Sequence, residues 1–173
     1  TSLTLTVNTD AKQVYSYEGA KILEELAKLD KLEVLNLGIS HNSLDHLEDL
    51  IKSRTNSLHT MKSVFQTLRK LKNVKISLPY SDYDESLVAT LARNNPDLTG
   101  LRFMNYPSLS EESVDLLASS CPGLQELNIS FRDGASESNK LSSSFPNLKH
   151  LCVRCFGSDD EQLMKFGEKF RRL

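Results

Sequence analysis

The side chains of this sequence that are best suited to chemistry are its three cysteines and four histidines. Cys152 and Cys155 form a C-x-x-C pair, a spacing that suits thiolate ligands of zinc or a redox-active disulfide. A structural zinc site needs further ligands, and the sequence holds no second cysteine pair. The third cysteine, Cys121, is expected to be buried at the end of a helix. We therefore expect no metal site, no cofactor and no redox role.

Motifs for catalysis are missing as well. The histidines are dispersed, and none has a fixed spacing to a candidate nucleophile. The seven glycines form no phosphate-binding loop, and neither G-x-S-x-G nor H-E-x-x-H occurs. The sequence therefore predicts that the protein is not an enzyme.

Composition narrows the possible partners. Lys and Arg number 21 against 23 Asp and Glu, and the basic residues are scattered, so a nucleic-acid partner is not expected. No apolar run approaches the roughly 20 residues of a membrane-spanning helix, so a membrane partner is not expected either. Three cysteines are too few for a disulfide framework, which favours the cytoplasm or the nucleus.

The elements that position these residues are indicated by an internal repeat. A pattern L-x-x-[LV]-x-[hydrophobic] occurs five times, and its first leucines are 39, 27, 26 and 24 residues apart. These first leucines are Leu32, Leu71, Leu98, Leu124 and Leu148, with Leu173 as the start of a sixth unit. Five matches in register are much stronger evidence than one, because leucine is a common residue.

A second signature lies three residues before each first leucine. The position is apolar in every unit except one, where it is Asn95, and in three units proline follows it. An apolar residue buried at the helix end, followed by a proline that stops the helix, predicts a turn into the next strand. The full set at this position is Leu29, Leu68, Asn95, Cys121, Phe145 and Phe170.

Helical spacing of apolar residues between the strands completes each unit as strand, turn, helix and return. Leu3, Leu5 and Val7 alternate with threonines and predict one more strand at the start. We expect an α/β leucine-rich-repeat solenoid, with a curved parallel sheet on the concave side and helices on the convex side. Residues 1–173 are interpreted as a single domain of about six repeats, and as a fragment of a longer protein because solenoid ends need caps. The alternative is that an atypical helix at each end acts as the cap.

The 39-residue interval exceeds the others, and its extra residues fall near 54–70. Apolar residues spaced by three and four there, among them Met61 and Phe65, predict an additional amphipathic helix. We expect this helix to pack on the convex side, the alternative being a projecting insert that contacts a partner. The stretch 133–144, rich in polar residues, is expected to be a loop.

Side chains alternate along a strand, so the third, fifth and seventh positions of the pattern should face outward on the concave side. This surface is where a protein partner is expected to bind. A cation beside an adaptable methionine suits such an interface. The candidate partner-binding residues are Asn36, Lys75, Arg102, Met104, Asn128, His150 and Arg154.

Repeats of about 26 residues that end in Cys-Pro-x-Leu resemble the cysteine-containing class of leucine-rich repeats, with the closest match over Leu101–Leu124. This class is best known from F-box/leucine-rich-repeat proteins, the substrate receptors of cullin-RING (SCF-type) ubiquitin ligases. The resemblance implies protein recognition, with a ligase adaptor bound through a segment outside these residues, because no F-box is recognisable here and only one repeat carries the cysteine. The alternatives are a scaffold or adaptor without a ligase link, and a basic pocket for a small anion around Lys75 and Arg102.

Overall fold

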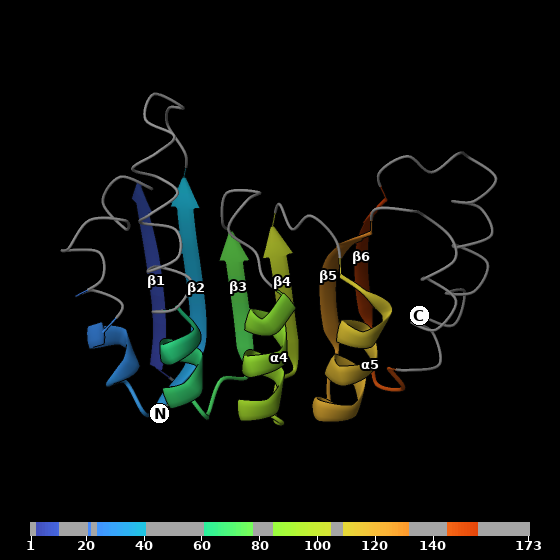
Figure 1. Ribbon diagram of the computed structural model, residues 1–173, viewed down its shortest axis with the longest axis horizontal. Helices are drawn as coiled ribbons and strands as arrows, with labels where there is room; N and C mark the ends of the chain where they lie inside the picture. The colour runs from blue at the N-terminus through green and yellow to red at the C-terminus, as the bar shows by residue number, and fades with distance from the viewer. Residues whose placement is uncertain are drawn as a thin grey trace.

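Six strands form one sheet in the computed structural model of the chain (Figure 1), which describes residues 3–10, 21, 24–40, 61–77, 85–104, 109–131 and 145–155. The strands follow one another in chain order, and every neighbouring pair is parallel. They are β1 (Leu3–Asp10), β2 (Leu32–Ser40), β3 (Asn73–Ser77), β4 (Gly100–Met104), β5 (Glu126–Phe131) and β6 (His150–Cys155). The parallel α/β arrangement and the strand at the start of the chain are confirmed.

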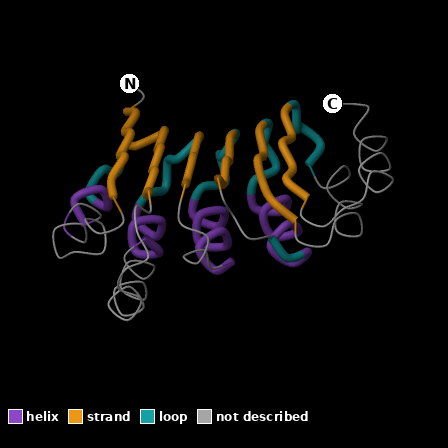
Figure 2. Tube along the Cα trace, turned by 90° about the horizontal axis from the view of Figure 1, so that it is seen from above, coloured by secondary structure: helices purple, strands orange, loops and turns teal. Residues whose placement is uncertain are grey.

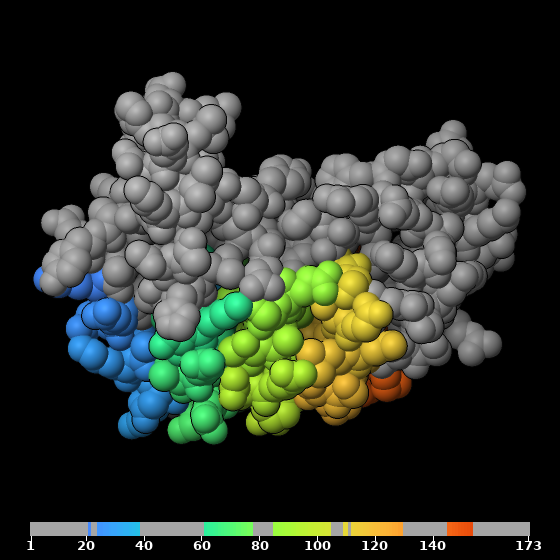
Figure 3. Space-filling model, in the orientation of Figure 1, coloured from blue at the N-terminus to red at the C-terminus, as the bar shows by residue number. Residues whose placement is uncertain are grey.

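The described helices lie on one side of this sheet, as Figure 2 shows. α4 (Glu85–Asn94) lies between β3 and β4 in the chain, and α5 (Glu111–Ser120) lies between β4 and β5. Residues 24–27 and 61–67 are helical too and precede β2 and β3. In the space-filling view, successive units follow each other along the long axis of the molecule (Figure 3). Each unit therefore contacts mainly the units before and after it.

The strand register places the repeated leucines in one interior column. Leu35, Val74 and Leu101 are consecutive Cα partners, and the column continues through Leu127 to Leu151. The first four of these side chains are buried and Leu151 is half-buried. A second interior column contains Leu37, Ile76 and Phe103, all buried. The side chains between these columns point to the other face, as the alternation predicts.

One turn recurs just before four of the strands, β2, β4, β5 and β6. The N–H of the first leucine donates to the carbonyl three residues earlier, at 3.0, 3.1, 3.1 and 3.3 Å in four units. A single carbonyl of one unit then accepts from two consecutive N–H groups of the next, for example Lys72 O from Thr99 and Gly100 at 2.8 and 2.9 Å. The four turns join Leu32 to Leu29, Leu98 to Asn95, Leu124 to Cys121 and Leu148 to Phe145.

Asn95 is the one polar residue among the helix-end positions, and its buried side-chain amide makes two hydrogen bonds. Its Oδ1 accepts from the backbone N–H of Leu71 at 2.8 Å, one unit earlier. Its Nδ2 donates to the carbonyl of Leu91 at 3.0 Å, at the end of its own helix. Asn95 is 1% exposed, so the two bonds satisfy an amide that would otherwise be costly to bury.

The amphipathic helix predicted near 54–70 is present at residues 61–67. Residues 61–67 form the helix that precedes β3, the place that α4 and α5 take in the next units. Met61, Val64 and Phe65 are buried in the core, so the expected packing against the core is confirmed. The extra length of this interval therefore falls in 41–60, which lies outside the described residues, as do the loop predicted at 133–144 and the apolar residues around 44–51 and 163–170.

The start of α5 is tied to the preceding unit. Ser110 is the N-cap, and its hydroxyl accepts from the N–H of Ser113 at 3.3 Å. The Glu85 carboxylate accepts from the N–H and the hydroxyl of Ser110, at 2.9 and 2.6 Å, and from the hydroxyl of Ser113 at 2.9 Å. Glu85 opens α4, so this cluster fixes the first turn of one helix against the next.

We expect Asn95→Ala to lower the free energy of unfolding by about 1–3 kcal/mol, because it leaves the buried N–H of Leu71 without its acceptor. Urea unfolding followed by circular dichroism would measure the change. Asn94→Ala is the matched control, since Asn94 is half-buried and makes one bond, to the carbonyl of Thr90. That substitution should cost less than about 0.5 kcal/mol. Equal losses for the two variants would contradict the bridging role of Asn95.

Candidate binding surface

The sheet face that points away from the helices is the candidate binding surface, and we call it the open face. Among the described residues, no helix lies on this side of the sheet (Figure 2). Its side chains come from the third, fifth and seventh positions of each repeat, the positions that the alternation assigned to it. From β2 to β6 it contains Val34, Asn36, Gly38, Asn73, Lys75, Ser77, Gly100, Arg102, Met104, Glu126, Asn128, His150 and Cys152.

Four of the predicted binding residues form a straight row across the strands. Asn36, Lys75, Arg102 and Asn128 are successive Cα partners in neighbouring strands. Adjacent members are therefore about 5 Å apart along the row. Lys75 and Arg102 are exposed, whereas Asn36 and Asn128 are half-buried. The register thus aligns residues that are separated by 26 to 39 positions in the sequence.

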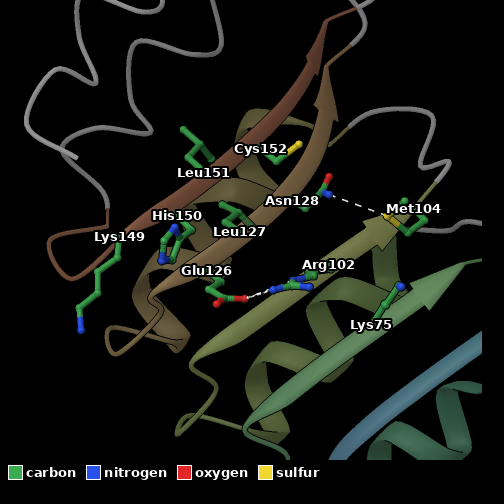
Figure 4. Close-up of a pocket in the computed structure, with 10 residues that line it drawn as sticks. All are labelled: Lys75, Arg102, Met104, Glu126, Leu127, Asn128, Lys149, His150, Leu151 and Cys152. Carbon is green, nitrogen blue, oxygen red and sulfur yellow. Dashed lines mark hydrogen bonds and ion pairs between the residues drawn. The ribbon is translucent and has the colours of Figure 1, made fainter. Parts of the chain in front are cut away.

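A hollow of about 780 Å³ brings five of the predicted residues together (Figure 4). Asn36 lines a second hollow of about 280 Å³, which shares Lys75 and Arg102 with the first. Arg154 lies on β6 beside Ser130 of β5, but its side chain is outside the described residues. The larger hollow is lined by Lys75, Arg102, Met104, Glu126, Leu127, Asn128, Lys149, His150, Leu151 and Cys152.

Glu126, which was not among the predicted site residues, pairs with Arg102 inside the hollow (Figure 4). Nε and Nη2 of Arg102 both donate to Oε2 of Glu126, Nε at 3.2 Å. The two side chains are 52% and 34% exposed, so the pair contributes little to stability. Its main effect is to offset part of the positive charge of Arg102. Glu126 occupies the third position of the repeat that follows the one with Arg102. An acidic residue at that outward-facing position is the sequence feature that could have indicated this pair.

Gly100 allows a close approach on the open face. A Cβ built on Gly100 would lie 2.1 Å from Oδ1 of Asn73, its partner on β3. Such a distance is far below van der Waals contact, so the Asn73 amide occupies the space that a side chain would need. Gly100 and Asn73 both line the smaller hollow.

The amide of Asn128 is poorly satisfied. Its Nδ2 makes a long contact of 3.8 Å to the thioether sulfur of Met104, which is a weak acceptor (Figure 4). Its Oδ1 is buried and accepts no hydrogen bond within the described part of the chain. A buried amide oxygen without a donor costs about 1–3 kcal/mol, so this side chain is not optimised for the stability of the fold.

The cysteines behave as two separate thiols. Cys121 is fully buried at the end of α5, as expected, with its Sγ 3.5 Å from the carbonyl oxygen of Asn95. Burial raises the pKa of Cys121 to about 11 from the ordinary value of 9.0. Cys152 is exposed on the open face, and the side chain of Cys155 is outside the described residues.

The described residues contain neither a candidate metal centre nor a candidate membrane-spanning helix. Within them, no three His, Cys, Asp or Glu side chains gather as a metal ion would require. Every helix of the described residues is too short or too polar to span a lipid bilayer. Comparison with protein-family models and with curated proteins gives no match. The geometry of the open face therefore carries the functional argument.

We predict that iodoacetamide at pH 8 modifies Cys152 in the folded protein and leaves Cys121 unmodified. At a pKa of about 11, roughly one thiol in a thousand is ionised at that pH, and burial also blocks the reagent. Peptide mass spectrometry would measure both sites, with a urea-unfolded sample as the control in which both react. Rapid native labelling of Cys121 would contradict its place in the core.

Proposed function

We propose that the chain is part of a leucine-rich-repeat solenoid whose open face recognises another protein. The recurring turn, the interior leucine columns and the alternation of strand and helix support this class of fold. Repeat proteins of this kind use one continuous surface made from many units, because each unit contributes a few side chains at a fixed spacing. The repeat count and the limits of the domain remain predictions.

The observation that carries the proposal is the registered row from Asn36 to Asn128, flanked by two hollows that share Lys75 and Arg102. Any one of these side chains could be a solvated polar residue of a sheet. A row of polar side chains held in register beside a hollow offers a partner a fixed arrangement, which reduces the entropy lost on binding.

The resemblance to the cysteine-containing repeats extends the proposal to ubiquitin ligation. In this extended form, the chain is the substrate-recognition part of a cullin-RING (SCF-type) receptor, and a segment outside these residues contacts the ligase adaptor. Cys121 at the end of α5, followed by Pro122, matches the helix end of that repeat class. The alternative is a scaffold or adaptor that uses the same face without any ligase link.

The proposal assigns no catalytic step, cofactor, nucleic acid or membrane to this chain. It places the protein in the cytoplasm or the nucleus, because an exposed free thiol at Cys152 suits a reducing compartment.

Site-specific photo-crosslinking tests the recognition surface. A benzophenone amino acid at Asn36 or at Cys152 brackets the row, and the matched control carries it at Arg93, which is exposed at the end of α4. In cell extract we expect both open-face positions to label one and the same protein, identified by mass spectrometry, and the Arg93 position not to label it. Labelling only from Arg93, or of no protein at all, would remove the open face as the recognition surface.

Purification of the full-length protein from cells separates the two forms of the proposal. A cullin adaptor that co-purifies in stoichiometric amounts would support the ligase receptor. Its consistent absence, with the cross-linked partner still present, would favour the scaffold.

A further inference from the structure

The positive charge of the open face is concentrated where β3 and β4 meet. Lys75 and Arg102 are Cα partners there, and both side chains are exposed. Both also line the two hollows, so they stand on the boundary between them. Arg102 is turned toward Glu126, whereas Figure 4 draws no interaction between Lys75 and the other lining residues.

The charge of the larger hollow differs from that of the chain. Its lining contains three cations, Lys75, Arg102 and Lys149, and one acid, Glu126. The whole chain carries a net charge of -2. A locally positive surface on a mildly acidic chain favours an anionic partner through charge complementarity.

The apolar side chain of Met104 in the lining helps to distinguish between a nucleic acid, a small anion and a peptide as the anionic partner. Met104 is half-buried beside Asn128 and offers an adaptable contact for an apolar side chain. A nucleic acid is held largely through its phosphates, and three cations opposed by one acid can neutralise only a few of them. A small inorganic anion would leave Met104 unused. A peptide with both acidic and apolar residues uses both parts of the hollow.

Glu126 limits where the acidic residue of such a peptide can lie. An acidic side chain that lies over Lys75 and Arg102 is attracted by both cations. One that lies closer to β5 is repelled by the carboxylate of Glu126. Met104 lies on the strand next to Lys75, two residues beyond Arg102, so the Cα atoms of Lys75 and Met104 are about 8 Å apart. An extended peptide covers that distance in about two or three residues. The acidic residue and the apolar residue would therefore be about two or three positions apart.

We propose that the open face binds an extended peptide segment of its partner, with an aspartate or glutamate over Lys75 and Arg102 and an apolar side chain beside Met104. This inference rests on the proposed function, because it specifies what the recognition surface takes. Asn128 supports it, since its poorly satisfied amide can turn toward a backbone N–H of the peptide without losing a strong hydrogen bond.

The test is selection from a phage-displayed library of random peptides of about ten residues against the full-length protein. Selected peptides should be enriched in an acidic residue about two or three positions from an apolar one. A fluorescein-labelled representative should bind about tenfold more weakly to the double variant Lys75→Gln, Arg102→Gln, as measured by fluorescence anisotropy. The matched control, Lys70→Gln with Arg93→Gln, removes two exposed cations outside the open face and should bind like the unaltered protein.

Glu126→Gln should change peptide affinity in the opposite direction to the Lys75/Arg102 double variant. It removes the carboxylate that competes for Arg102, so affinity for the acidic peptide should rise about threefold. A general loss of structure would weaken binding instead. Selected peptides without acidic residues, or an equal loss in the Lys70/Arg93 control, would overturn the inference. So would full competition by 10 mM citrate, because the site would then take any small anion.

Failure here can be distinguished from failure of the proposed function. If the cross-links from Asn36 and Cys152 identify one partner while no acidic peptide is selected, the recognition surface stands and the acidic-peptide inference is wrong. If the cross-links also fail, the recognition proposal itself is wrong.

Discussion

Parallel backbone pairing between consecutive strands is the interaction on which the rest of this molecule depends. A unit of 24 to 27 residues cannot bury its apolar side chains alone, so each interior column is completed by the neighbouring strand. A slip of β4 by one residue against β3 would exchange Leu101 with Arg102 between the two faces. An unpaired guanidinium in the core costs several kcal/mol, so the register is strongly specified. The same register that forms the core also forms the open face.

Polar contacts at the helix ends strengthen this register on the other layer. Asn95 reaches the backbone of Leu71 in the previous unit, and Glu85 reaches the cap of the next helix through Ser110. Each contact spans one unit, so the helices are held at the spacing that the strands impose. Neighbouring units are therefore joined both in the sheet and in the helical layer. The open-face side chains consequently have a fixed spacing in the absence of a partner.

How much of this could be predicted depends on whether a feature is local. The interior column through Leu101, the outward position of Arg102 and the buried Cys121 follow from periodicity, which one unit already displays. The role of Asn95 does not, because its acceptor oxygen serves an N–H located 24 residues earlier in the chain. The pairing of Arg102 with Glu126 also joins different units and depends on side-chain rotamers. Spacing predicts the helix at 61–67 but does not show that it lies directly before β3, in the place that α4 takes before β4.

The quality of packing differs between the two faces, and the difference bears on function. The interior columns are buried from β2 to β5 and half-buried at Leu151, whereas the open face contains features that contribute little to stability. The ion pair of Arg102 is half exposed, Gly100 gives up a side chain, and Asn128 contains the one buried side-chain oxygen or nitrogen without a partner in the described residues. A sequence under selection for folding alone would replace such residues readily, since stabilising substitutions at surface positions are common. Residues that are not the most stabilising choice for their position tend to lie at functional sites. Their concentration around the two adjoining hollows is therefore an argument for binding at the open face that does not depend on the net charge of the lining.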